Sequence, residues 1–343
     1  MRQPNLTAMP RPAQRPDQSI VEPVRRAPVL PLPRSRGRTA RRLAVLTFQE
    51  VTDPASFRAQ MERLQRNANP VAPAAVEAAL AGGAPLPPHA TLVSFELGHR
   101  SVVDVALPVL TALGIPAVAF VVAGLVDTEC PYWWQEAEFL LDQGGRARGL
   151  SERTPGGVTA ALSALPDPDR RRSLQELRVT ARRQAPGCAQ LTSTDLLELR
   201  SGGVAVGNHT LGHTRLDSCD DYALREEVVG GHERLARLSG GQPTAFAYPD
   251  GGFDRRAESL LRELGYRSAF LSDGALFDLR GPRGGAAGSA GGSGSAGDGD
   301  SQRPDPLRIS RLNVNAGTAR GLFDGVLSGW TPSTRRLRGE VAV

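Results

Sequence analysis

Short apolar runs alternate with amphipathic stretches along most of this chain, and this alternation constrains the fold more than any other feature. Runs such as 43–48, 91–95 and 117–122 have the length of buried strands. The last of these is apolar throughout, as parallel strands covered on both faces are. Stretches with helical spacing follow them, for example 101–113. Strands that alternate with helices predict a parallel sheet.

The second half of the chain repeats the pattern after a polar, Arg-rich stretch at 144–190, which we interpret as an insertion with one helix around 170–183. About seven strand–helix repeats, with polar residues at the strand ends, predict a closed (β/α) barrel with its site on that face. A doubly wound open sheet is the alternative, but no Gly-rich phosphate loop follows the first strand. The later predicted helices are 192–200, 220–238 and 254–264, and the later predicted strands are 204–206, 244–248, 266–271 and 307–314.

The first 42 residues differ from the rest in composition. They hold ten arginines against two acidic residues, a charge of +8, whereas the whole chain carries +5, so the remainder carries 5 − 8 = −3. An acidic body gives no basic face for nucleic acid. We predict that this Arg/Pro-rich arm is disordered. It is either a solvated tail or a contact for an anionic partner.

The ends and linkers of the chain suggest little further structure. Residues 281–302 are nearly all Gly, Ala and Ser and predict a flexible loop, and 321–343 reads as a C-terminal tail. No run is apolar for long enough to span a membrane, and prolines break the apolar part of the N-terminus. The expected compartment is the cytoplasm, or the cell envelope or exterior if the start is misassigned.

A pair of histidines, His209 and His213, follows the apolar strand 204–206 in the sequence V-A-V-G-N-H-T-L-G-H-T. Four residues make about one helical turn, so a helical conformation would bring both imidazoles to one side. Neutral imidazole is the commonest metal ligand among side chains. The spacing predicts half of a metal site, with a coincidental surface pair as the alternative.

Residues 43–316 resemble the polysaccharide deacetylase family, carbohydrate esterases with a NodB-homology domain that remove acetyl groups from sugars. The sequence H-T-L-G-H-T-R-L is similar to the family's H-[ST]-x-x-H motif, and F-A-Y-P-D-G-G-F-D resembles its third motif, usually F-x-Y-P-Y-G. The order and spacing of these motifs carry the resemblance. It implies a distorted (β/α)7-type barrel over residues 43–320.

The resemblance also implies a mechanism. A divalent metal, usually zinc, is held by two histidines, here His209 and His213, and by an aspartate, with water in an open position. A second carboxylate takes the water's proton as general base. Backbone N–H groups near the third motif stabilise the oxyanion.

The first motif of the family, T-F-D-D-G, is altered in this chain to S-F-E-L-G at 94–98. Glu96 falls on the base position, and Leu97 falls on the ligand position, where it supplies no donor. Two protein ligands and water hold zinc poorly. Glu96 is therefore a candidate base or a candidate substitute ligand.

The third motif supplies further candidates. Tyr248 and Pro249 are predicted substrate contacts, and Asp250 replaces the family's Tyr and could take the base role if Glu96 bound the metal. Phe246 stands where many members have an Arg that orients the base. No histidine follows His232, so the late histidine that is the general acid in many members is missing.

Two more residues have both a functional and a structural interpretation. Arg311 lies in I-S-R-L-N, a sequence similar to the family's closing strand, and is a candidate to pair with Glu96 or to form an ion pair of purely structural use. Trp133, on a predicted helix at 131–141, is a candidate sugar-stacking platform or a core residue.

Taken together, the sequence predicts a hydrolase that removes acetyl groups from an amino-sugar glycan, cleaving a non-peptide C–N bond with metal-activated water. The alternative is a degenerate member, a pseudoenzyme that binds saccharide or a partner enzyme. A third hypothesis places the role in the N-terminal arm.

Overall fold

The structure, a computed structural model, describes residues 41–280, 304–315, 317–318 and 320–327. The predicted arm, apart from its last two residues, and the predicted Gly/Ser/Ala loop lie outside these residues. Within them, no helix is both long and apolar enough to cross a membrane.

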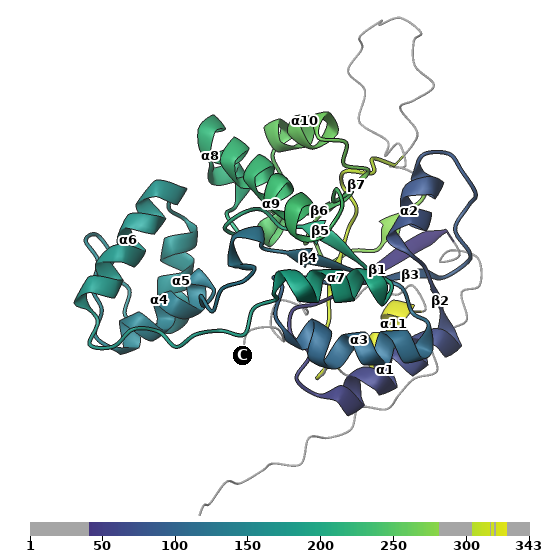
Figure 1. Ribbon diagram of the computed structural model, residues 1–343, viewed down its shortest axis with the longest axis horizontal. Coiled ribbons are helices and arrows are strands. Elements are labelled where there is room, and N and C mark those ends of the chain that lie inside the picture. Colours follow the sequence, from purple (N-terminus) through teal and green to yellow (C-terminus); the bar gives the residue numbers. More distant parts are fainter. Residues whose placement is uncertain (1–40, 281–303, 316, 319, 328–343) are drawn as a thin grey trace, which may run out of the picture. The chain divides into compact units, whose positions relative to one another are not determined.

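A mixed sheet forms the centre of the fold (Figure 1). Its main path runs β7-β6-β5-β4-β3-β1-β8, with β2 beside β3 and β9 beside β1. All pairs are parallel except β1 with β8. The strands are β1 Arg42–Phe48, β2 Asn69–Pro70, β3 Ala90–Phe95, β4 Ala117–Val121, β5 Val204–Asn208, β6 Ala245–Ala247, β7 Ser268–Phe270, β8 Phe277–Asp278 and β9 Leu312–Asn313.

The segment around β9 lies between β1 and β7. Ile309 pairs in parallel with Phe270 of β7, and Leu312 pairs in parallel with Leu46 of β1. The sheet therefore curls into the distorted (β/α) barrel that the sequence predicts. The predicted strand at 307–314 is shorter than expected, because only two of its residues form a regular ladder.

Alternate residues of the strands enter two different apolar clusters. On β1, Leu43 and Val45 pack in one cluster with Val118 and Phe120, whereas Ala44 and Leu46 pack in the other. This alternation follows from the two-residue period of a strand. It explains why the strands are apolar on both faces.

Helices cover the outer face of the sheet (Figure 1). Asp53 caps the first of them by accepting hydrogen bonds from the backbone of Ala55 and Ser56, and Thr192 with Asp195 forms a capping box on α7. The predicted helices at 101–113 and 220–238 contain π-helical turns at Val102–Ala106 and Glu226–Gly230. The helices are α1 Pro54–Asn67, α2 Pro73–Leu80, α3 Leu107–Leu113, α7 Ser193–Ser201, α8 Asp221–Arg225, α9 Gly231–Leu238 and α10 Arg255–Glu263.

Three helices, α4 Trp133–Asp142, α5 Pro155–Ser163 and α6 Asp167–Thr180, form a group beside the sheet (Figure 1). They share an apolar cluster of their own. The predicted insertion thus contains two helices rather than one. The missed helix, α5, begins at a Thr-Pro pair that is a typical helix start, but the two glycines after it obscured the signal.

The start of the predicted C-terminal tail is also helical. Helix α11, Arg320–Leu327, buries Phe323, Val326 and Leu327 in the same cluster as α1 and α3. Arg63 of α1 forms an ion pair with Asp324. These residues of the tail therefore belong to the barrel.

Candidate active site

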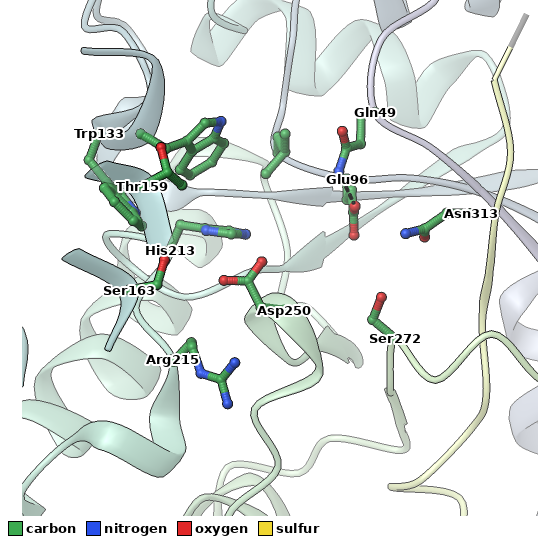
Figure 2. A pocket seen from close by; sticks show the side chains of 12 residues that line it. Gln49, Glu96, Trp133, Thr159, Ser163, His213, Arg215, Asp250, Ser272 and Asn313 are labelled. Carbon is green, nitrogen blue, oxygen red and sulfur yellow. Dashed lines mark hydrogen bonds between the residues drawn. The ribbon is translucent and has the colours of Figure 1, made fainter. Parts of the chain in front are cut away.

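A cavity of about 390 Å³ lies where several strands end, and Figure 2 shows the Glu96 and Asp250 carboxylates and the His213 ring pointing into it. Polar groups dominate its wall on the barrel side, and two tryptophans face it from α4. Such a position, at the carboxyl ends of parallel strands, is the expected place for a site in a (β/α) barrel. The lining residues are Gln49, Glu96, Leu97, Trp133, Trp134, Thr159, Ser163, His213, Arg215, Asp250, Ser272 and Asn313.

Glu96 follows β3 directly and is held from both sides. Gln49 Nε2 donates to its Oε1 at 2.9 Å, and Arg311 Nη1 donates to its Oε2 at 3.1 Å. Glu96 is 6% exposed and lines the cavity. Two donors in fixed positions therefore orient the carboxylate.

Arg311 is fully buried, and its Nε donates to the carbonyl of Leu271 at 2.9 Å. Burial lowers its pKa, and the nearby Glu96 carboxylate opposes that effect. Arg311 thus forms the ion pair with Glu96 that the sequence raised as a candidate. Phe246, at the position where many family members have an arginine, is buried in the core.

His209 and His213 lie on a loop after β5, so the one-turn helical geometry expected from their spacing is wrong. Positive φ angles of 68° at Thr210 and 56° at His213 turn the chain instead. The two rings still meet, with centroids 4.6 Å apart and planes at 74°. The loop brings the histidines together by a different route from the one predicted.

The hydrogen bond of His209 fixes its tautomer. Its Nδ1 is 2.8 Å from the carbonyl oxygen of Ala247, which only accepts, so Nδ1 carries the proton. Its Nε2 is then a lone-pair donor, buried and without a hydrogen-bond partner, 3.9 Å from Glu96 Oε2. Complete burial, together with the nearby His213 and Arg311, keeps the pKa of His209 well below its usual value.

The ring of His213 makes no hydrogen bond with any described residue, and its Nδ1 is buried. Trp134 packs against it at 4.8 Å between ring centroids. Burial lowers the pKa of His213, and the strongest opposing influence comes from Asp250, followed by Glu96. Both histidines are therefore neutral near pH 7 and have lone pairs to offer.

Contacts from α6 and α8–α9 fix the histidine loop. Glu227 accepts from the backbone N–H of Gly212 at 2.7 Å and pairs with Arg171 at 3.0 Å. Arg170 of α6, which is buried, donates to Thr214 Oγ1 at 2.9 Å. The helical insertion therefore supports the position of His213.

Leu97 occupies an apolar corner beside Glu96. Its side chain is 7% exposed and packs with Val122 and Tyr132. Its φ of 76° is left-handed, a conformation that aspartate tolerates better than leucine. Leu97 brings no donor atom to the cavity.

Asp250 has a very different setting. It lies in the turn Pro249–Gly251 with φ 50° and ψ 18°, and the turn is held by a bond from Gly251 N to Tyr248 O at 3.2 Å. Its side chain is exposed to the cavity, and no described residue forms a hydrogen bond or ion pair with its carboxylate. Asp250 is thus a free carboxylate on a rigid turn.

The predicted substrate contacts occupy different places. The Tyr248 side chain is fully buried against Phe246 and Phe253, and its ring does not line the cavity. Pro249 is also buried, and only its turn reaches the site. Trp133 lines the cavity, with the guanidinium of Arg170 4.9 Å from its ring centroid.

The resemblance implies a divalent metal at this site. Two buried imidazoles with unpartnered nitrogens fit a divalent cation, because such atoms are costly to bury without a partner. Among the described residues, no three His, Cys, Asp or Glu side chains are gathered closely enough to form a complete site. The two histidines fit a metal but supply only two of its protein ligands.

Several lining residues were not predicted. Gln49, Ser272 and Asn313 lie at or just after strands that the sequence identified, so the rule that barrel sites form at strand ends could have found them. Thr159 and Ser163 come from α5, and no sequence signal placed that helix against the barrel.

Comparisons with known proteins agree with this architecture. The sequence model of the family described as polysaccharide deacetylase matches residues 83–269. No curated protein matches the chain by sequence.

Several solved structures share the fold. The Streptococcus pyogenes deacetylase PplD in complex with acetate has a TM-score of 0.53 and 14% identity, covering 85% of this chain and 99% of that chain. IcaB from Ammonifex degensii has a TM-score of 0.52 and 20% identity, covering 84% and 96%. A de-N-acetylase from Aggregatibacter actinomycetemcomitans has a TM-score of 0.50 and 16% identity, covering 81% and 97%.

Proposed function

Since the chain belongs to the polysaccharide deacetylase family, we propose that it hydrolyses the acetyl amide of an acetylated amino-sugar glycan in the cavity beside Glu96. One observation carries the proposal: the Glu96 carboxylate, held by two donors, lies 3.9 Å from the buried Nε2 of His209, and His213 lines the same cavity. A de-N-acetylase among the similar structures supports the choice of an amide bond.

Glu96 is the proposed general base. It accepts a proton from water, whose oxygen bonds to the acetyl carbon, and it then gives that proton to the sugar nitrogen as the C–N bond breaks. The products are acetate and a free amine. Returning the proton through Glu96 meets the need for an acid in a chain that has no histidine after His232.

Arg311 and Gln49 position the base. Their hydrogen bonds to the two carboxylate oxygens prevent rotation of the Glu96 side chain, so a lone pair stays directed at the cavity. Asp250 contributes its backbone N–H as the proposed donor to the oxyanion.

His209 and His213 would hold the divalent metal, with zinc as the proposed ion. When bound, that ion would lower the pKa of water and polarise the acetyl carbonyl. Burial keeps both imidazoles neutral, which a ligand requires.

Trp133 is proposed to contact the sugar ring. One face of its indole is covered by Arg170, so a sugar would use the part of the ring that lines the cavity. Thr159 and Ser163 offer hydroxyl groups on the same wall, which suit the hydroxyl groups of a saccharide.

Acetate release from acetylated chito-oligosaccharides tests the proposal. Wild type should release acetate, and Glu96→Gln should lower the rate by about 100-fold or more, as expected for a lost general base. Asp104→Asn, which removes an exposed carboxylate outside the cavity, is the matched control and should keep the wild-type rate. Circular dichroism confirms that each variant is folded.

The result that would refute the proposal is equally clear. A wild-type protein that binds the oligosaccharide but releases no acetate would be the saccharide-binding alternative. Equal rates for wild type and Glu96→Gln would remove Glu96 from the chemistry.

A further inference from the structure

Leu97 leaves the two histidines without the third ligand that a metal needs, and the structure offers two carboxylates that could replace it. These are Glu96 and Asp250, which both line the cavity with His213. The contacts that each carboxylate already makes distinguish between them.

Glu96 is poorly suited to a ligand role. Both of its oxygens accept hydrogen bonds, one from Gln49 and one from the guanidinium of Arg311. Binding a metal would require the ion to approach a carboxylate whose charge is already balanced by a buried cation, and the two cations would repel each other. It would also remove the proposed base.

Asp250 has the opposite properties. Its carboxylate is exposed to the cavity and has no hydrogen-bond or ion-pair partner among the described residues. Figure 2 shows it directed toward the His213 ring. A free carboxylate can rotate onto an ion without breaking any existing contact.

The backbone at Asp250 supports a dedicated function for that position. Its φ of 50° is left-handed, where aspartate is tolerated and most side chains are disfavoured. Bonds from Gly251 N to Tyr248 O and from Gly252 N to Pro249 O hold the turn. These bonds keep Asp250 at the edge of the cavity.

We propose that Asp250, rather than residue 97, is the third protein ligand of a divalent metal bound by His209 and His213. The inference rests on the proposed function for the presence of a metal at this cavity, and it assigns the ligand independently of catalysis. One acidic and two imidazole ligands with an open position form a set that zinc and cobalt accept.

In the described conformation these side chains do not form a complete site, so binding would require the Asp250 side chain to rotate toward the histidines. Rotation of the side chain loses conformational freedom and lowers the affinity. An aspartate at position 97 would place a second carboxylate next to Glu96 in the chain. It would also relieve the strain of leucine at the left-handed φ of 76°.

Cobalt binding tests the ligand assignment without using activity. Co²⁺ is titrated into the full-length apoprotein, and its visible absorption and binding heat are followed. Wild type should bind one ion. Asp250→Asn, which keeps the size of the side chain, should weaken binding at least tenfold, and adding Leu97→Asp to that variant should restore it.

Two further variants separate the alternatives. Asp217→Asn is the matched control, because Asp217 is a nearby carboxylate that is paired with Arg215, and it should change the affinity less than twofold. Wild-type affinity in Asp250→Asn would overturn the proposal, as would wild-type protein that binds no cobalt. Loss of cobalt binding in Glu96→Gln alone would assign the ligand to Glu96.

Acetate release is measured separately on the same proteins. If wild type releases acetate and Asp250→Asn keeps its cobalt affinity, the ligand assignment fails and the proposed function stands. If cobalt binding depends on Asp250 but no acetate appears, the proposed function fails and the ligand assignment stands.

Discussion

Replacing Glu96 with glutamine is expected to lower the free energy of unfolding by about 3 kcal/mol. The reason is Arg311, which is fully buried and whose direct ion-pair partner is Glu96 at 3.1 Å. Removing one partner of a buried pair costs about 3–5 kcal/mol, because an uncompensated charge remains in the protein interior. The lower end applies, since the amide oxygen of glutamine can still accept a hydrogen bond from Arg311.

A double-mutant cycle followed by urea unfolding measures this effect. The variants are Glu96→Gln, Arg311→Met and the double substitution. The double variant should lose less stability than the sum of the two single variants, by about 2 kcal/mol, because neither charge is then left alone. Asp104→Asn is the control: Asp104 is 3.4 Å from Arg100 in an exposed pair, and its removal should cost less than about 0.5 kcal/mol.

Two results would refute the reasoning. If Glu96→Gln cost as little as the exposed control, Arg311 would not depend on Glu96 for its charge balance. If the two single variants were additive, the 3.1 Å contact would carry no coupling energy, and the proposed orientation of the base by Arg311 would lose its support.

Three further predictions concern buried groups. Burial raises the pKa of Glu77, which accepts from Thr244 and Ser268, so its ionised form destabilises the fold at neutral pH. Glu77→Gln should therefore raise the melting temperature at pH 7, with the gain disappearing as pH falls below the unfolded-state pKa of about 4.3; a pH-independent gain would refute this. Tyr248→Phe removes a buried hydroxyl without a partner, so unfolding in urea should show a change between zero and about 1 kcal/mol of stabilisation, and acetate release should be unaffected. Phe323→Ala should destabilise by about 3–5 kcal/mol in the same assay if α11 belongs to the core, and a change below about 1 kcal/mol would mean that it does not.

Much of the barrel could be predicted from the sequence because its strands are short apolar runs with helical stretches between them. The exceptions have physical causes. Helix α5 has two glycines directly after its first residue, Pro155, and they weaken any helical signal. Helix α11 has apolar residues at helical spacing, Phe323 and Val326, but the basic residues that follow suggested a solvated tail.

The sequence predicts that His209 and His213 lie together, but the structure brings them together by a different backbone conformation from the predicted one. Helical spacing suggested that His209 and His213 face the same way, whereas positive φ angles on a loop bring their rings together. The bond from His209 to Ala247 depends on β5 lying beside β6, which no local pattern reveals. The wall from α5 is likewise a product of tertiary packing.

Hydrolysis in water enriched in the heavy oxygen isotope tests the central claim most directly. If water attacks the acetyl carbonyl in the cavity beside Glu96, mass spectrometry should find one heavy oxygen atom in each released acetate and none in the sugar product. Unlabelled acetate, or no acetate at all from wild-type protein on acetylated chito-oligosaccharides, would contradict the account.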